Sequence, residues 1–211
     1  MPVVVDIILQ MARALKYMHG KGVAHLDIKP SNILATPASV PELADQGYVD
    51  VKLVDFGESQ PLRRLGSSTC TMHTANMGTT EYRAPELFQV PNNCCTGEAE
   101  EWISNRIDAL KADVYSYGIT CAELLTGEYP YPFPEFQRTD LLSTILQGVR
   151  PHLPHEYCPV PLQDLIVRCW DTHPCNRPTF LQVCEELTDL KTFIHFNHQT
   201  EKKQEPSYTH T

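Results

Sequence analysis

The sequence predicts one mainly α-helical domain that carries a small β-ribbon. Residues 3–19 place apolar side chains three and four positions apart, the spacing of one face of an amphipathic helix. Residues 113–125 are apolar around most of the helix circumference, which is typical of a helix in the middle of a core. Two short stretches, 33–35 and 49–54, have the pattern of paired strands. A chain of 211 residues is long enough for one such core.

Three more helices are expected in the C-terminal half of the chain. Residues 139–147 and 162–170 are helical by pattern, and a last helix is expected to end at about Leu190. The folded domain is therefore expected to span residues 1–194. Residues 195–211 are polar and are predicted to form a disordered tail, because polar residues cannot bury enough apolar surface to fold.

Two polar stretches are expected to be surface loops. Residues 36–47 are rich in proline and lie between the two predicted strands. Residues 88–108 contain a run of acidic side chains. A solvated loop is the simpler interpretation of the second stretch, and a partner-binding loop is the alternative.

Composition and charge limit the kinds of partner. A net charge of −9 argues against nucleic acid or an anionic membrane as the main partner. No apolar run reaches the length of a membrane span, and the N-terminus lacks the basic region of a signal peptide. None of the eight cysteines forms a C-x-x-C pair, so a zinc site is not expected. We expect a cytoplasmic protein with free thiols, of which Cys121, Cys169 and Cys184 fall in apolar helical patterns.

The stretch His25-Leu26-Asp27-Ile28-Lys29-Pro30-Ser31-Asn32 is typical of a phosphate-transfer loop. The carboxylate of Asp27 could accept a proton from a substrate hydroxyl. The ammonium of Lys29 could neutralise charge on a moving phosphoryl group. The side-chain oxygen of Asn32 could bind a divalent metal.

A second possible metal ligand follows in Asp55-Phe56-Gly57. The predicted ribbon would present Asn32 and Asp55 on the same side, although many positions separate them. The sequence therefore predicts that two oxygen ligands converge at one end of the ribbon.

Ala84-Pro85-Glu86 completes a series of motifs. The order H-x-D-x-x-x-x-N, D-F-G, A-P-E resembles the signature set of eukaryotic protein kinases. The resemblance covers residues 3–194 and matches the C-terminal, catalytic lobe, which would be a helical bundle with a β-ribbon and without the β-rich N-lobe. The C-W…R-P-T-F pattern near residue 177 resembles the tyrosine-kinase-like group.

This resemblance implies a serine/threonine kinase that uses ATP and Mg²⁺ to phosphorylate protein substrates. It implies that Asp27 is the catalytic base and that Lys29 binds the γ-phosphate. Asn32 and Asp55 would hold magnesium, and Leu34 would lie beneath the adenine.

The resemblance also implies roles for structural residues around the loop. His25 and Phe56 would stack in an internal spine; a histidine packed in the core is compatible with this role. Asp113 would accept backbone N–H groups of the catalytic loop, and a role as a helix N-cap is compatible with this.

The resemblance covers three further residues, Thr79 in the substrate-docking loop and the structural residues Glu86 and Arg177. Thr79 lies in a segment that resembles the substrate-docking loop of Ser/Thr kinases, and together with Lys29 it favours Ser/Thr over Tyr as the acceptor. Arg177 matches the arginine that pairs with Glu86 of the A-P-E motif.

Two features depart from the family pattern. Leu26 stands where the H-R-D motif has the arginine that binds phosphate on the activation segment, here residues 58–83, which suggests a different regulation. No Gly-rich loop or V-A-I-K lysine precedes residue 25, so we expect an N-lobe or a receptor portion upstream, and weak ATP binding by these 211 residues alone. Three interpretations of the chain stay open: part of an active kinase, a truncated binding module, or a pseudokinase. The presence of Asp27, Asn32 and Asp55 favours the first.

Overall fold

The computed structural model describes residues 1–62, 78–88, 108–132 and 138–204. Its α-helices are α1 (Pro2–Gly20), α2 (Pro41–Ala44), α4 (Ala109–Thr126), α5 (Arg138–Leu146), α6 (Val160–Cys169) and α7 (Phe180–Gln204). Its strands are β1 (Val23–Ala24), β2 (Ile33–Pro37), β3 (Val49–Leu53) and β4 (Gln60–Pro61). Its 3₁₀ turns are η1 (Pro30–Asn32), η2 (Thr80–Tyr82), η3 (Pro85–Phe88) and η4 (Pro174–Asn176). The described structure is mainly helical, as the sequence predicts, and it has two small sheets where one ribbon was expected.

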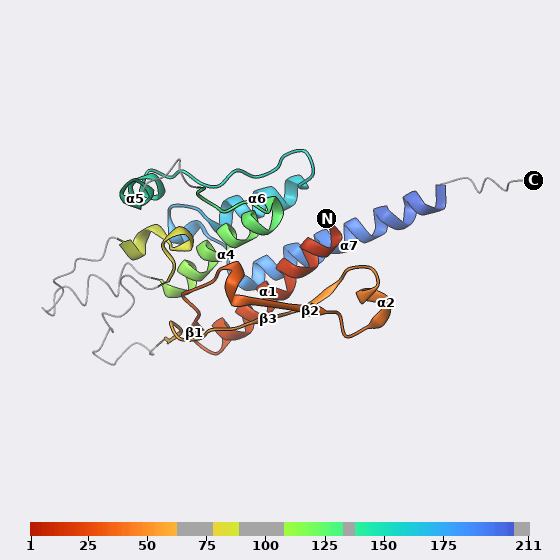
Figure 1. Ribbon diagram of the computed structural model, residues 1–211, viewed down its shortest axis with the longest axis horizontal. Coiled ribbons are helices and arrows are strands. Elements are labelled where there is room, and N and C mark those ends of the chain that lie inside the picture. The colour runs from red at the N-terminus through yellow and green to blue at the C-terminus, as the bar shows by residue number, and fades with distance from the viewer. Residues whose placement is uncertain (63–77, 89–107, 133–137, 205–211) are drawn as a thin grey trace, which may run out of the picture.

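The longest helices, α1 and α7, lie side by side (Figure 1). His19 near the end of α1 packs its ring edge-on against Phe180 at the start of α7, with centroids 4.9 Å apart. Asp6 near the start of α1 contacts Lys191 farther along α7. The two helices are therefore antiparallel.

Helix α4 runs through the middle of the core and contacts both α1 and α6 (Figure 1). Most of its side chains are buried on every side, as its continuous apolar pattern predicts. The helix begins at Ala109 and not at residue 113 as expected, because Asp108 caps it. The Asp108 carboxylate accepts hydrogen bonds from the backbone N–H groups of Leu110 and Lys111, at 3.0 and 3.3 Å.

The predicted ribbon is formed by β2 and β3, which are antiparallel. Ile33 lies opposite Leu53 at one end, and Pro37 lies opposite Val49 at the other. Strand β2 is longer than expected, so it takes up the first part of the predicted 36–47 loop, and the short exposed helix α2 takes up another part. The remaining strands, β1 and β4, form a second antiparallel pair.

The other predicted helices are present with small shifts at their ends. Helices α5 and α6 occupy the stretches predicted as 139–147 and 162–170. Tyr131, Leu141 and Ile145 form a smaller buried cluster beside the main core.

The last helix extends well past the predicted end at Leu190. Helix α7 continues to Gln204, so residues 195–204 are helical where a disordered tail was expected. Leu187 and Leu190 are buried against the core, whereas Phe193 and Phe196 are exposed. The apolar periodicity therefore stops before the helix does. The rest of the predicted tail, residues 205–211, lies outside the described residues.

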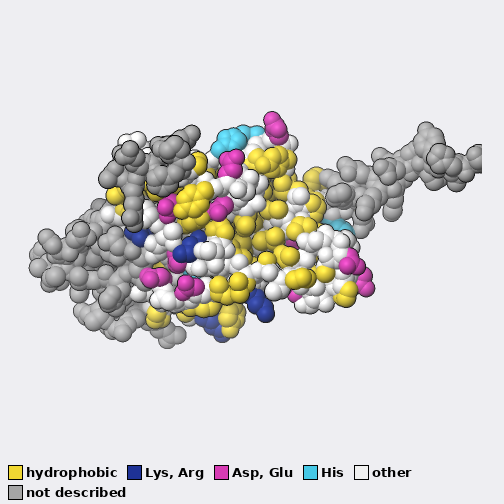
Figure 2. All heavy atoms as spheres, in the orientation of Figure 1, with side chains coloured by type: hydrophobic (Ala, Val, Ile, Leu, Met, Phe, Trp, Pro, Cys, Tyr) yellow, Lys and Arg dark blue, Asp and Glu magenta, His cyan; other side chains and the backbone are white. Residues whose placement is uncertain are grey.

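The described surface is mixed in character. On the face drawn in Figure 2, acidic side chains lie among hydrophobic ones. None of the described helices is both long and apolar enough to cross a membrane. The predicted burial of Cys121, Cys169 and Cys184 is confirmed, and these three are free thiols.

Candidate active site

The start of the 25–32 loop is held by one buried carboxylate on α4. Asp113 accepts the backbone N–H of His25 with Oδ2 and that of Leu26 with Oδ1, both at 2.7 Å. The ring Nε2 of His19 lies 2.8 Å from Oδ2 of the same carboxylate. The expected contact between Asp113 and the loop is therefore present. Asp113 does not also cap α4, because Asp108 is the N-cap of that helix.

Asp27, Lys29 and Thr79 form a closed set of polar contacts. Thr79 donates its backbone N–H and its hydroxyl to Asp27 Oδ1, at 3.0 and 2.9 Å. Lys29 Nζ donates to the Thr79 hydroxyl oxygen at 2.7 Å and lies 2.8 Å from Asp27 Oδ2. The loop that carries Asp27 is thereby joined to the segment that carries Thr79.

The environment of Asp27 keeps its carboxylate ionised. Burial acts to raise the pKa, but hydrogen bonds from the ammonium of Lys29, from the Thr79 hydroxyl and from a nearby amide outweigh it. The pKa of Asp27 therefore lies below its ordinary value. An ionised carboxylate can accept a hydrogen bond from an incoming hydroxyl and can later accept its proton.

Asn32 is buried behind Asp27 and is oriented by it. Its side-chain NH₂ group donates to the backbone oxygen of Asp27 at 2.7 Å and to Asp27 Oδ2 at 2.9 Å. Because both donors are used there, the side-chain oxygen of Asn32 faces away from Asp27, where it can bind a cation.

Asp55 lies at the end of the ribbon next to Asn32. The backbone N–H of Val54 donates to the backbone oxygen of Asn32 at 3.0 Å, which brings the two predicted ligands to one end of the ribbon. Asp55 has φ of 60°, a left-handed conformation that is uncommon for a residue other than glycine, and its Oδ1 accepts the Gly57 N–H at 3.3 Å. Carboxylate and amide oxygens are ligands that Mg²⁺ prefers, so this donor set fits magnesium.

No group of three or more His, Cys, Asp or Glu side chains within the described ranges could hold a metal ion unaided. A cation at Asn32 and Asp55 would therefore need further oxygens, such as those of phosphate groups. This requirement fits magnesium bound together with a nucleotide, since Mg²⁺ is commonly held by one or two carboxylates plus substrate phosphates.

The side chains expected in the internal spine and beneath the adenine differ in burial. His25 is fully buried and its ring lies 5.4 Å from that of Phe56, so the predicted stacking pair is in contact. Phe56 and Leu34 are each 53% exposed, at the same end of the ribbon. Their exposure leaves apolar surface open beside the two oxygen ligands.

The predicted pair between Glu86 and Arg177 is present and largely buried. Two guanidinium nitrogens of Arg177 donate to the two carboxylate oxygens of Glu86, at 2.6 and 2.8 Å. Arg177 also donates to the backbone oxygens of Lys111 and Asp171, which satisfies the rest of its buried charge. This pair attaches the segment after Thr79 to the helical core.

The chain matches the protein kinase domain family over residues 2–187. The chain belongs to the protein kinase family. It is 38% identical over 193 residues to a light-sensor protein kinase of Ceratodon purpureus, a match that covers 90% of this chain and 14% of that protein. It is 32% identical over 176 residues to the serine/threonine-protein kinase mos of Patiria pectinifera, which covers 83% of this chain and 43% of that protein.

A third relative is a protein kinase and PP2C-like domain-containing protein of Oryza sativa subsp. japonica. It is 35% identical over 216 residues, which covers 92% of this chain and 30% of that protein. The kinase chain described here thus spans less than half the length of these curated relatives.

One glycine that shapes the candidate site was not among the predicted site residues. Gly78 has φ of 80°, and a Cβ added there would lie 2.4 Å from the backbone oxygen of Leu26. Only glycine allows this close approach of the two segments, which places Thr79 against Asp27. The signal that could have revealed it is a glycine directly before the docking-loop threonine.

Leu26 is 4% exposed and has φ of 66°. Its side chain is apolar and buried, so it offers no hydrogen-bond donor at the place of the H-R-D arginine. The hydroxyl residues of the predicted activation segment between 63 and 77, and most of the 88–108 insertion, lie outside the described residues of this kinase.

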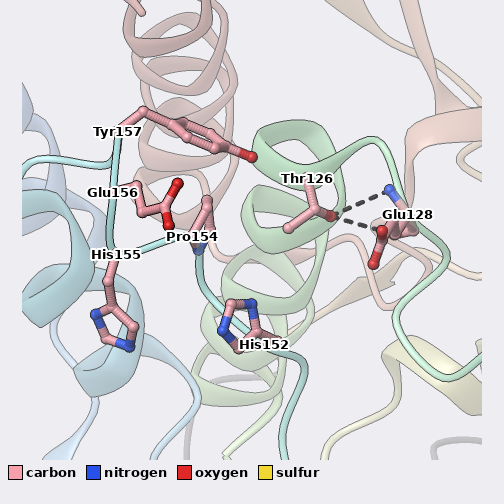
Figure 3. A pocket seen from close by; sticks show the side chains of 7 residues that line it. All are labelled: Thr126, Glu128, His152, Pro154, His155, Glu156 and Tyr157. Atoms are coloured by element: carbon pink, nitrogen blue, oxygen red, sulfur yellow. Dashed lines mark hydrogen bonds between the residues drawn. The ribbon is translucent and has the colours of Figure 1, made fainter.

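A cavity of about 370 Å³ lies away from these residues, between the end of α4 and the segment that precedes α6 (Figure 3). Glu156 and Tyr157 of that segment line it opposite Thr126 and Glu128. None of the predicted site residues lines this cavity, so it is separate from the candidate active site of the kinase.

Proposed function

We propose that this chain is the C-terminal, catalytic lobe of a protein kinase that transfers the γ-phosphate of ATP to Ser and Thr hydroxyls of protein substrates. The observation that carries the proposal is the closed contact set of Asp27, Lys29 and Thr79. It puts an ionised carboxylate and a cation together at one point between two loops. Phosphoryl transfer needs mainly such positioning and charge neutralisation.

Each residue of this set has a separate task in the proposal. Asp27 accepts the hydrogen bond of the substrate hydroxyl, which orients the oxygen for attack, and then takes its proton. Lys29 offsets negative charge that develops on the transferred group. Thr79 holds both side chains in place through its hydroxyl and its backbone N–H.

Asn32 and Asp55 would hold magnesium, and the exposed face of Leu34 would contact the adenine. Bound magnesium would neutralise charge on the β- and γ-phosphates of ATP. The general use of Mg-ATP by the family supports this assignment, as does the side-chain oxygen that each of the two residues offers.

Acceptor specificity for Ser and Thr is supported by Lys29 and Thr79. Their contacts with each other and with Asp27 place an ammonium and a hydroxyl directly beside the carboxylate. The names of several relatives as serine/threonine-protein kinases agree with this choice.

The alternative is a catalytically inactive kinase-like chain that serves as a protein-binding module. The absence of a G-x-G-x-x-G sequence from these 211 residues favours this alternative for the chain in isolation. The ordered contacts of Asp27 and Asn32 favour catalysis, since an inactive module does not need them. A cytosolic location is also a proposal, supported by the free cysteines among the described residues.

Phosphotransfer from γ-labelled ATP tests the proposal. It should be measured on the 211 residues alone and on an extended protein, in which the nucleotide-binding lobe of a related kinase is joined ahead of Pro2. We expect no transfer and weak Mg-ATP binding from the 211 residues, and transfer to Ser and Thr from the extended protein. Asp27→Asn in the extended protein should leave ATP binding nearly intact and reduce turnover by about a hundredfold or more, equivalent to about 2.7 kcal/mol.

Asp164→Asn on the exposed side of α6 is the matched control and should keep the parent rate. Equal turnover in Asp27→Asn and the parent, or phosphotyrosine as the main product, would contradict the proposed function. An extended protein that binds Mg-ATP and transfers nothing would favour the binding-module alternative.

A further inference from the structure

The side chain of Gln10 on α1 pairs with the outer edge of β3. Its Nε2 donates to the backbone oxygen of Val49 at 2.8 Å, and its Oε1 accepts the backbone N–H of Val51 at 2.9 Å. In a two-stranded ribbon every second residue of a strand directs its backbone groups away from its partner strand. The carboxamide of Gln10 therefore supplies a donor and an acceptor to the β3 edge, as the backbone N–H and C=O groups of a third strand would.

The orientation of this carboxamide follows from its other partner. Gln10 Nε2 also donates to Asp6 Oδ2, at 2.8 Å. Because a carboxylate and a carbonyl only accept hydrogen bonds, the NH₂ group must face both Asp6 and Val49. The amide oxygen is left for the Val51 N–H. Only an amide can make all three contacts, because a carboxylate of the same shape would meet two acceptors, Asp6 and the Val49 oxygen.

The series of polar contacts that begins at Gln10 extends from α1 to α7. The second oxygen of Asp6 contacts the ammonium of Lys191, so Asp6 bridges a cation and the Gln10 amide. Asp6 is 9% exposed. A buried carboxylate with two donors is a firm anchor for the amide.

Strand β3 leads directly to the proposed magnesium ligand. It ends at Leu53, the Val54 N–H donates to the backbone oxygen of Asn32, and Asp55 follows in a left-handed conformation. Any slip or fraying of β3 would thus move Asp55 relative to Asn32. A group that does not touch the metal but orients one of its ligands has a large effect on metal affinity.

We propose that Gln10 is a positioning residue that holds β3 against α1, so that Asp55 stays aligned with Asn32 at the end of the ribbon. This inference rests on the proposed function, in which Asp55 and Asn32 hold magnesium. It adds a residue outside the phosphate-transfer motifs to the determinants of the site.

The first test does not depend on activity. Backbone amide hydrogen exchange is measured by NMR on the 211 residues, with Gln10→Glu compared with Gln46→Glu, which alters an exposed glutamine that bonds only within its own turn. Gln10→Glu would set a carboxylate oxygen against Asp6 and the Val49 carbonyl, and the resulting displacement of the side chain from β3 should speed exchange about tenfold or more at Val51. It should also speed exchange at Val54, which Gln10 does not touch. Amides of α6 should keep the parent rates in both variants.

Equal acceleration in α6 and at Val54 would mean that Gln10 contributes only to global stability, and it would overturn the inference. Gln10→Met, which keeps the length of the side chain without a charge, guards against loss of folding in Gln10→Glu. Unchanged exchange at Val54 in Gln10→Met would also overturn it.

The second test measures the magnesium dependence of phosphotransfer in the extended protein. Gln10→Met should raise the Mg²⁺ concentration for half-maximal rate by about tenfold, the lower end of the effect of residues that orient metal ligands. The rate at saturating Mg²⁺ should change little. A lower maximal rate with an unchanged Mg²⁺ midpoint would contradict the inference. An inactive parent protein would instead count against the proposed function, and the exchange result would still decide the role of Gln10.

Discussion

The guanidinium of Arg177 makes two hydrogen bonds to the carboxylate of Glu86, at 2.6 and 2.8 Å, although 91 positions separate the two residues. Arg177 is 1% exposed and lies 5.1 Å from the ring of Tyr115. A charge buried to this degree depends on its partner, because water cannot replace the carboxylate.

Arg177→Ala should therefore lower the free energy of unfolding by about 3–5 kcal/mol, the usual cost of breaking a buried ion pair. Arg168→Ala is the control, because Arg168 forms an exposed pair with Glu186 and should cost no more than about 1 kcal/mol. Urea denaturation of the 211-residue chain measures both. Equal losses in the two variants would show that burial does not strengthen the Glu86 pair.

The lowered pKa of Asp27 depends on its neighbours and can be tested directly. Burial raises this pKa, so removal of the strongest opposing contact in Lys29→Met should make the Asp27 carboxyl protonate at a higher pH than in the parent. A carboxyl whose pKa is lower in the folded state than in the unfolded state stabilises the fold at pH values above the unfolded-state pKa. This stabilisation is lost as the pH falls through the folded-state pKa. Carboxyl ¹³C shifts report the midpoint. Lys52→Met, on the exposed side of β3, should leave it unchanged.

Gly78→Ala should be more harmful than Gly22→Ala, although both glycines have positive φ. At Gly22 nothing lies within 4 Å of the added Cβ, so only the left-handed conformation is penalised, at about 1–2 kcal/mol. At Gly78 the Cβ would also lie 2.4 Å from the backbone oxygen of Leu26. Thermal unfolding of the two variants should rank them in this order, and a larger loss at Gly22 would contradict the close approach.

Leu26 leads to a prediction about regulation. A phosphate can order a loop only if a cation receives it, and the buried Leu26 side chain offers none. Activity of the extended protein should therefore depend little on phosphorylation of the activation segment. The hydroxyl residues to replace together by alanine are Ser67, Ser68, Thr69, Thr71 and Thr74. A fall in rate of about a hundredfold, or about 2.7 kcal/mol, would mean that another cation does the work of the missing arginine. Phosphatase treatment of the parent provides the independent comparison.

The elements that sequence could predict are those with a local pattern. Helix α1 and the ribbon of β2 and β3 lie close to their predicted bounds, because their apolar periodicity directly reflects which face is buried. The start of α4 was missed because Asp108 caps a turn that precedes the apolar run. The end of α7 was missed because that helix continues past the last side chains that it can bury.

The contacts that build the candidate site cannot be predicted from a local sequence pattern. The resemblance to kinases named Asp27, Lys29 and Thr79, but nothing near residue 27 in sequence says that a hydroxyl 52 positions away both donates to its carboxylate and accepts from the lysine. Gln10 was missed for a related reason. A polar residue on an amphipathic helix is ordinarily solvated, and only the folded chain brings β3 to it.

The single carboxylate of Asp113 has a consequence for how the chain folds. Its partners are 87, 88 and 94 positions earlier in the sequence, so the loop contacts close very long segments of chain. Contacts of this range form slowly, and we expect them late on the folding pathway. Asp113→Asn should then mainly speed unfolding and hardly slow refolding in stopped-flow measurements. At roughly 5–20 residues per second on the ribosome, about 4 to 17 s separate the synthesis of the loop from the synthesis of Asp113, and the loop cannot take its final shape earlier.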